Sequence, residues 1–463
     1  MRALRVKVAW LAIAIAVWPA GGRSASAAEW LQFRGPSGQG LVEEALPLRW
    51  GEGHGIAWKT PLPGRGWSSP VVSGDRIWLT TAEERPADEA ERRKMLDAVK
   101  DVPVAGDMSA VASVVLAALE VDLASGKLLR QVKLFEIDAP PAIHGHNSYA
   151  SPTPVIVGDR VFCHFGTFGT ACVEMPTGAV AWRRRLEIDH IVGPGSSPAA
   201  FGNLLIVPCD GSDRQFIAAL DLQTGDVVWQ RERPPIRQAD PDQRKAFSTP
   251  LVIHAGGLPQ AVIPGAQWFV AYHPATGEEV WRVDHDSGFS NVPRPVFDGE
   301  RLFLCTGFGK RGLWAVQPDG RGDVTASHVQ WRQDQHAPTT SSPVVSDGRL
   351  YLVADGGVLS CLATDSGRLL WRKRLGGAYS ASPLVGQGRV YLFSQEGLTT
   401  VLADAAQYQV LAENQLDGML MASPAVADGT VIVRSDTHLY RVAGVAAPGE
   451  VGAGGLPAEA ARP

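Results

Sequence analysis

The sequence predicts an all-β fold: an eight-bladed β-propeller of four-stranded antiparallel blades. The first observation is a phrase of a small or polar residue, a proline, two or three apolar residues and a glycine turn. It occurs eight times, at Pro70, Pro154, Pro198, Pro250, Pro295, Pro343, Pro383 and Pro424. The second is a Thr-Gly or Ser-Gly turn followed four residues later by tryptophan, at Trp182, Trp229, Trp281 and Trp371. Repeats with such a long, fixed period predict identical units arranged around one axis.

Each repeat reads as four short strands. In the sixth copy the proline phrase is followed by apolar runs at 349–353 and 358–362, and a charged strand begins at Trp371. Val, Ile, Tyr and Trp dominate these runs, as is typical of strands. Residues 55–444, without an insertion at 83–113, give about 45 residues per unit, the usual length of a blade.

The eighth copy lacks a fourth strand, because residues 423–442 hold only three apolar runs. We predict that residues 56–60, at the other end of the propeller, supply this strand and close the ring. Closure would remove the exposed sheet edges that invite aggregation. We interpret the repeated tryptophan as packing between neighbouring blades, where a large ring buries much area.

The ends of the chain differ from the repeats. Residues 1–28 combine Arg2, Arg5 and Lys7 with an apolar run at 8–20 and small residues at 25–27, the pattern of a secretory signal peptide. We expect a lead-in at 29–54, the propeller at 55–443 and a disordered tail at 444–463, rich in glycine, alanine and proline. The predicted location is periplasmic or secreted, with no transmembrane segment.

Charge limits the partners. Removal of the leader's four basic residues changes the formal net charge from −5 to −9, which argues against nucleic acid and anionic lipid as partners. We expect a monomer whose partner is an envelope protein or a carbohydrate. The five cysteines include no CxxC motif. Cys163 and Cys172 flank a predicted turn, and both two buried thiols and a disulfide are compatible with this spacing.

Strand order predicts where a ligand would bind. The loops before the repeated prolines and the turns between second and third strands must share one rim of the ring. The candidate ligand-binding residues on that rim are His144, His146, Asn147, His164, Asp210, Arg214, Gln267, Asp355 and Gln395. The insertion at 83–113, with a helix capped by Asp88, should project over the same rim.

No chemistry-bearing motif stands out on this rim. His144-Gly145-His146, with His164, offers imidazoles for a transition metal, but loop histidines beside glycine need no metal, and we favour that interpretation. The sequence has no glycine-rich phosphate loop, GxSxG or HExxH motif. We therefore predict no catalytic residues and no metal site.

The repeat resembles a known family. The fullest copy, from Asp221 to Trp229, together with Pro-Val-Val and Gly-Asp-Arg, resembles the pyrroloquinoline-quinone (PQQ)-type propeller repeats over residues 55–443. Two groups share these repeats: the quinoprotein alcohol and glucose dehydrogenases, and the non-enzymatic propeller lipoprotein of the outer-membrane barrel-assembly machinery. The lead-in at 30–36 is similar to that of exported bacterial propeller proteins.

Departures from both groups bear on function. The resemblance to the dehydrogenases implies two adjacent cysteines over the quinone and oxygen ligands for calcium, whereas this sequence has neither adjacent cysteines nor an acidic cluster. The lipidated cysteine of the second group is also absent. We expect a non-catalytic scaffold or binding protein of the cell envelope without a cofactor. The alternative is a PQQ- and calcium-dependent dehydrogenase that oxidises an alcohol or a sugar.

Overall fold

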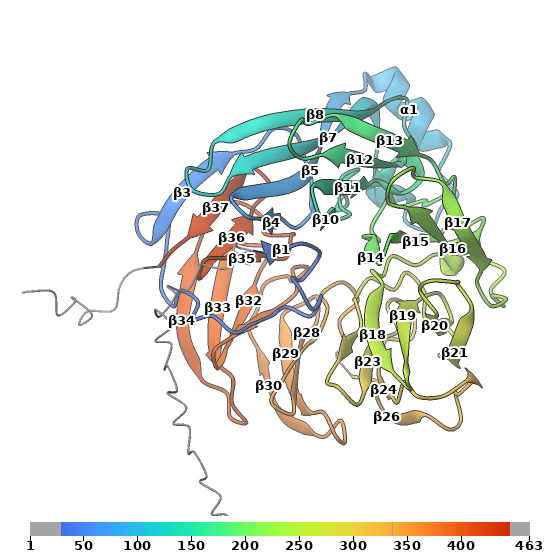
Figure 1. Cartoon of the computed structure of the whole chain (residues 1–463), viewed down its shortest axis with the longest axis vertical. Helices are drawn as coiled ribbons and strands as arrows, with labels where there is room; N and C mark the ends of the chain where they lie inside the picture. Colours follow the sequence, from blue (N-terminus) through green and yellow to red (C-terminus); the bar gives the residue numbers. More distant parts are fainter. Residues whose placement is uncertain (1–28, 336, 445–463) are drawn as a thin grey trace, which may run out of the picture.

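The computed structural model describes residues 29–335 and 337–444, and shows eight sheets, each built on four antiparallel strands, arranged around one axis (Figure 1). The predicted eight-bladed β-propeller is confirmed. The predicted signal peptide and residues 445–463 of the predicted tail lie outside the described residues. In each blade the first strand lies next to the axis and the fourth lies at the outer edge.

The first four blades run from the blue to the yellow part of the chain. Blade 1 contains β4 (Val71–Ser73), β5 (Arg76–Pro86), β7 (Val111–Asp122) and β8 (Leu128–Asp138). Blade 2 contains β10 (Val155–Val157), β11 (Arg160–His164), β12 (Thr170–Glu174) and β13 (Val180–Arg184). Blade 3 contains β14 (Ala199–Phe201), β15 (Leu204–Asp210), β16 (Gln215–Asp221) and β17 (Val227–Glu232). Blade 4 contains β18 (Leu251–Ala255), β19 (Leu258–Pro264), β20 (Trp268–Tyr272) and β21 (Glu279–Asp284), edged by β25 (Gly322–Asp323).

The remaining blades complete the circle. Blade 5 contains β22 (Val296–Phe297), β23 (Leu302–Cys305), β24 (Leu313–Val316) and β26 (Val329–Gln333). Blade 6 contains β27 (Val344–Ser346), β28 (Arg349–Val353), β29 (Val358–Ala363) and β30 (Leu369–Arg374). Blade 7 contains β31 (Leu384–Gly386), β32 (Arg389–Phe393), β33 (Leu398–Ala403) and β34 (Val410–Gln415). Blade 8 contains β35 (Ala425–Ala427), β36 (Thr430–Arg434) and β37 (His438–Val442), with β3 (Ile56–Pro61) as its outer strand.

Strand β3 closes the ring, as predicted. It pairs antiparallel with β37, so that Thr60 lies opposite Leu439. The closure joins two segments nearly 380 positions apart in the sequence. Blade 8 thereby gains its fourth strand, and β37 has a partner on both sides. Such closure leaves no open edge between the first and last blades.

The repeated tryptophan packs between neighbouring blades. Trp182 of blade 2 donates its indole N–H to Leu222 O of blade 3 at 3.1 Å. Its ring lies against Gly225, where an added Cβ would come within 2.5 Å of it. Trp58 of β3 makes the same contact with blade 1, donating to Leu123 O at 3.0 Å. The Thr-Gly and Ser-Gly turns therefore place glycine where the tryptophan of the preceding blade needs room.

The chain between β5 and β7 leaves the first blade as an excursion. Both strands extend beyond the length of the other blades' strands, so that Glu84 still pairs with Val114. Between them, α1 (Glu89–Asp97) begins at Asp88, whose carboxylate accepts from Glu91 N at 2.8 Å in a capping box. After η1 (Ala105–Asp107), β6 (Met108–Ser109) pairs with β9 (Ile143–His144). The excursion thus returns to the rim that carries His144.

The lead-in enters the ring along its axis. Strand β1 (Glu29–Trp30) pairs antiparallel with β4, and β2 (Leu41–Val42) pairs parallel with β31. Both pairs lie at the innermost strands of their blades, and Figure 1 shows the connecting segment inside the ring. Because β1 starts opposite Ser73, at the end of β4, the chain enters from one face, turns over residues 32–40, and leaves by the same face.

The cysteines are buried free thiols, so the disulfide alternative for Cys163 and Cys172 is not realised. Cys172 lies opposite Phe162, and Cys163 lies opposite Ala171. Adjacent positions of a strand point to opposite faces of the sheet. The two sulfur atoms therefore belong to different packing layers, on either side of blade 2. Burial raises the pKa of the Cys172 thiol to about 11.

Candidate functional site: a pocket on the propeller axis

A cavity of about 700 Å³ lies on the axis. It is lined by the loops before the repeated prolines and by turns between second and third strands, such as those holding Arg311, Asp355 and Gln395. We call it the axial pocket, and we call the side of the ring on which it opens the pocket face. Phe33 of the lead-in lines it from the opposite side. The lead-in therefore makes the axial channel blind-ended.

A ring of hydroxyl groups surrounds the narrow part of this pocket. Its members precede the prolines of seven blades and all line the cavity; they are Ser69, Thr153, Ser197, Thr249, Ser342, Ser382 and Ser423. At six of the eight junctions a backbone N–H of one blade donates to the hydroxyl of the next, as from Ser69 N to Thr153 Oγ1 at 2.9 Å and from Ser382 N to Ser423 Oγ at 2.8 Å. We call this set the hydroxyl ring. It links the inner strands of adjacent blades.

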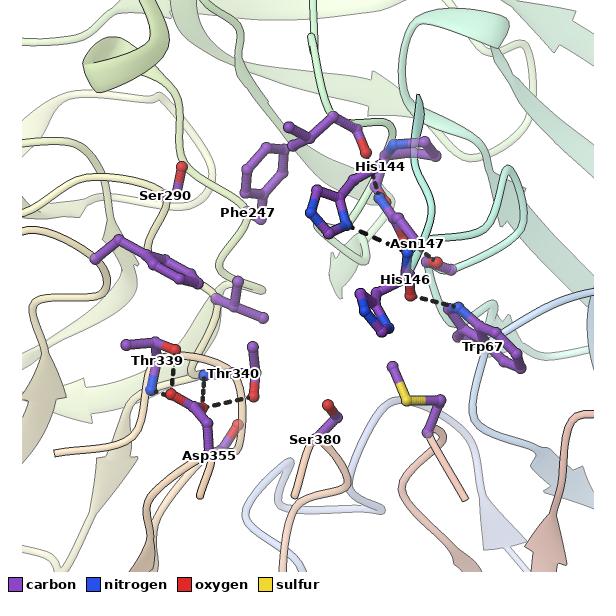
Figure 2. Close-up of a pocket in the computed structure, with 18 of the residues that line it drawn as sticks. Trp67, His144, His146, Asn147, Phe247, Ser290, Thr339, Thr340, Asp355 and Ser380 are labelled. Carbon is purple, nitrogen blue, oxygen red and sulfur yellow. Dashed lines mark hydrogen bonds between the residues drawn. The ribbon is translucent and has the colours of Figure 1, made fainter. Parts of the chain in front are cut away.

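His144 and His146 stand on one wall of the pocket with their rings stacked, 5.6 Å between centroids (Figure 2). The backbone of this loop is held by Trp67, which donates its indole N–H to His146 O at 3.0 Å. The Asn147 side chain donates from Nδ2 to Val192 O, in the linker between blades 2 and 3, at 2.9 Å. Burial is the main cause that lowers the pKa of His144, and the nearby His146 lowers this pKa further. The carboxylate of Asp107 acts in the opposite direction.

Asp355 lies across the pocket from the histidines and is fully engaged (Figure 2). Its carboxylate accepts from both the hydroxyl and the backbone N–H of Thr339 and of Thr340, at 2.5 to 3.2 Å. Gln395, in the next blade, donates to Ser380 Oγ at 2.7 Å. These bonds tie the second-to-third strand turns to the linkers beside them.

A buried ion pair and aromatic side chains form a third part of the wall. Lys245 is paired with Asp242 and also donates to its backbone carbonyl at 2.8 Å. Both side chains are shielded, with 2% and 12% exposure. Phe247 and Phe289 line the cavity beside them. The two carboxylates of the pocket wall are thus both committed within the protein.

Four of the nine predicted residues do not line the axial pocket. His164 is buried in blade 2 against Thr170 Oγ1 at 2.8 Å, and burial lowers its pKa to about 3. Asp210 forms a buried ion pair with Arg233 at 2.6 Å. Arg214 lies on the surface near Glu232, and Gln267 is fully buried, accepting from Arg237 N at 2.9 Å. Their turns reach the rim, but these side chains pack between or outside the blades.

Several pocket residues carry no signal that the sequence analysis used. In the sequence, Phe33 belongs to the lead-in and the hydroxyl-ring residues belong to the repeated proline phrase, while Phe247 belongs to no motif. A signal did exist for the ring: the position before proline is Ser or Thr in seven copies and Arg294 in the fifth. In a propeller, equivalent positions of all blades converge on the axis. A departure from the repeat at such a position marks a local specialisation.

The pocket residues do not fit a calcium-held quinone. None of the five cysteines lines the pocket, and all are buried in the blades. Calcium requires several oxygen ligands, but Asp242 is paired with Lys245 and Asp355 is saturated by two threonines. Over residues 29–335 and 337–444, no three His, Cys, Asp or Glu side chains gather closely enough to hold a metal ion. His164 in particular lies apart from His144 and His146.

Fold and pocket together define a PQQ-like eight-bladed propeller with a blind axial pocket. The family model described as "Outer membrane protein assembly factor BamB" matches residues 96–263 and 320–407, more than half of the chain, and the chain belongs to this family. The outer membrane protein assembly factor BamB of Alkalilimnicola ehrlichii is 28% identical over 183 residues. That match covers 38% of this chain and 42% of the relative, so this chain spans less than half of the relative's length.

Solved structures share the fold at low sequence identity. A europium-containing methanol dehydrogenase superposes with a TM-score of 0.62 at 12% identity, covering 89% of this chain and 91% of that chain. The quinohemoprotein alcohol dehydrogenase of Comamonas testosteroni gives 0.61 at 11% identity, covering 92% and 82%. These likenesses establish the propeller architecture. Among the described residues, no helix is long and apolar enough to cross a membrane.

Proposed function

We propose that this chain is a non-catalytic binding protein, exported to the bacterial cell envelope, that holds an envelope protein on its pocket face. The observation that carries the proposal is that two of the eight exposed large apolar side chains of the described residues stand at a concave surface, whereas the other six lie on outer strands or in the lead-in. Phe308 and Met419 are each 38% exposed and lie beside the axial pocket or the smaller hollow next to it. Exposed large apolar side chains around a concavity are typical of interaction surfaces.

Family membership supports a protein partner. The curated relative bears the name of an outer membrane protein assembly factor, which describes assembly and not turnover. The pocket residues support the same proposal, because both carboxylates of the pocket wall are engaged by groups of the protein. A carbohydrate partner is the alternative outcome of the binding experiment.

The experiment compares two faces of the molecule. Phe308→Glu and Met419→Glu place a charge in the proposed interface, and Val228→Glu places one on the outer strand of blade 3, where the valine is 53% exposed. We expect the first two variants to lose at least about 2 kcal/mol of partner binding in affinity purification from the native envelope. The Val228 variant should retain it. Equal loss, or equal retention, in all three variants would contradict the proposal.

The dehydrogenase alternative rests on the shared fold and is tested separately. Purified protein is incubated with PQQ and calcium, and dye reduction is measured with alcohols and sugars. We expect no turnover above that of free PQQ, because the pocket lacks both the adjacent cysteines and the oxygen ligands. Substrate-dependent dye reduction that follows the protein through gel filtration would establish the alternative.

A further inference from the structure

Three buried arginines lie around the axis without an acidic partner. Arg34, Arg294 and Arg434 are each 1–2% exposed. Over residues 29–335 and 337–444, none of them forms an ion pair with a carboxylate within 4.0 Å. Burial lowers the pKa of each to about 9, so all three remain charged at neutral pH. A buried charge normally requires a counter-charge or a dense set of hydrogen bonds.

Each of these arginines touches a residue next to the hydroxyl ring. Arg294 donates to Pro250 O at 2.8 and 3.1 Å and to Phe33 O at 2.5 Å. Arg34 reaches Pro383 O at 3.5 Å, next to Ser382. Arg434 donates to Ser68 Oγ at 2.7 Å, next to Ser69. Arg294 contacts Phe33, the lead-in residue that closes the axial pocket, and Arg34 follows Phe33 in the chain, so these two charges lie behind the closed end. Arg434 lies instead between blades 8 and 1, where it also donates to Thr80 O at 2.9 Å.

Two of these guanidinium groups, those of Arg34 and Arg434, have nitrogen atoms without a hydrogen-bond partner among the described residues. Nε and Nη1 of Arg34 and Nε of Arg434 are buried with no hydrogen-bond partner within the described chain. Mutual repulsion adds to the cost, since Arg294 contributes to the lowered pKa of Arg34. The closed end of the pocket therefore has a positive potential that the described residues leave unbalanced.

The hydroxyl ring adds donors above these cations. Thr153, Ser197 and their equivalents accept a backbone N–H and donate no hydrogen bond among the described residues, so their O–H groups are free. Ser69 is 1% exposed and its Oγ takes part in no hydrogen bond there. A ring of free O–H donors over buried cations favours an acceptor that carries negative charge.

The upper part of the pocket is different in character. Phe247, Phe289, Val192 and Met421 line it, and its charged side chains are already paired, as Lys245 is with Asp242. The volume of about 700 Å³ lies within the range of sites for small organic ligands. The pocket is thus apolar along the part of its wall that these four side chains form, and positive at its closed end.

From this arrangement we propose that the axial pocket is a ligand site for an amphiphilic carboxylate. The carboxylate head lies on the hydroxyl ring above Arg34 and Arg294, and the apolar body lies along Phe247 and Phe289. This site is separate from the partner-binding role of the exposed pocket face, and neither depends on the other.

The first experiment varies the head group on one apolar body. Octanoate, octanol and octylammonium are titrated into the purified full chain by calorimetry. We expect octanoate to bind at least about tenfold more tightly than octanol, and octylammonium not to bind, because the closed end of the pocket is positive. Equal binding of all three, or no binding of octanoate to the folded protein, would overturn the proposal.

The second experiment changes the cations and donors. Arg34→Gln and Arg294→Gln should each weaken octanoate binding by about five- to tenfold and leave octanol binding unchanged. Ser69→Ala removes a hydroxyl that has no hydrogen-bond partner among the described residues, and it should weaken octanoate binding by about twofold. Arg374→Gln, on the exposed end of β30, is the matched control.

A third measurement, on the unmodified chain, does not depend on whether the variants fold. In ¹³C-carboxyl octanoate, the titration of the bound carboxyl should occur at lower pH than in the free acid, since the cations favour the ionised form. A bound carboxyl that titrates at or above the pH of the free acid contradicts the proposal, even if both arginine variants unfold. Loss of partner capture with intact octanoate binding would refute only the proposed function.

Discussion

Glycine at two positions of the lead-in shows how single residues shape the axis. Gly38 has φ +70° and Gly40 has φ +73°, a region that L side chains rarely adopt. A Cβ on Gly38 would overlap the Arg294 guanidinium, and one on Gly40 would lie 2.8 Å from Pro383 O. The loop can therefore close over the buried arginines only because both residues lack a side chain.

Gly38→Ala separates this close approach from backbone strain. We expect it to cost about 1–2 kcal/mol for the left-handed backbone and a further penalty for displacing Arg294. Gly348→Ala is the matched control, because Gly348 has φ +72° and open space around its Cβ position. Urea unfolding should therefore show a larger loss for Gly38→Ala. Equal losses would show that the close approach to Arg294 makes no contribution to the free energy of unfolding.

Buried neutral histidines predict acid sensitivity. Burial lowers the pKa of His164 to about 3 and of His190 and His285 to about 4. The unfolded chain takes up protons below pH about 6.5, whereas the folded chain does not until about pH 4. Stability should therefore fall as pH falls through this window, by about 1.4 kcal/mol per pH unit for each histidine.

The measurement is urea unfolding at pH 7 and pH 5. His164→Asn removes one of the three groups and should reduce the difference between the two pH values by the contribution of one histidine. His254→Asn, at an exposed position of β18, is the control and should behave as the wild type. An unchanged pH dependence in His164→Asn would contradict the assignment of a buried neutral imidazole.

At the scale of elements, the lead-in, β3 and the excursion of blade 1 differ in what their sequences reveal. The need for β3 was predictable, because an incomplete eighth repeat requires a fourth strand. The axial course of the lead-in was not, since its partners Arg294 and Pro383 lie hundreds of residues away and no periodicity connects them. The capped helix α1 was predictable from a local motif.

The excursion provides a prediction about an element. Residues 88–109 are replaced by a short Gly-Ser link between β5 and β7. The excursion's apolar contacts, among Met95, Leu96, Met108 and Ala142, form their own small cluster apart from the blade cores. We therefore expect the melting temperature to change by less than about 4 °C, measured by calorimetry. Unfolding of the ring would show that the excursion is structural.

At the scale of the whole molecule, the repeat predicted the architecture and the rim but only part of the pocket. His144, His146, Asn147, Asp355 and Gln395 line the cavity because their turns point along the axis. His164, Asp210 and Gln267 occupy similar turns, yet their side chains pack into the interfaces between blades. Sequence position places a residue at the rim, whereas side-chain direction depends on strand register and on neighbours distant in sequence.

The central claim is that the pocket face is the binding surface, and site-specific photo-crosslinking in living cells tests it most directly. A photoreactive amino acid is placed at position 308, beside the axial pocket, or at position 228, on the outer strand of blade 3. The account predicts a discrete crosslinked envelope protein from position 308 and none from position 228. Crosslinking from position 228 alone would contradict it.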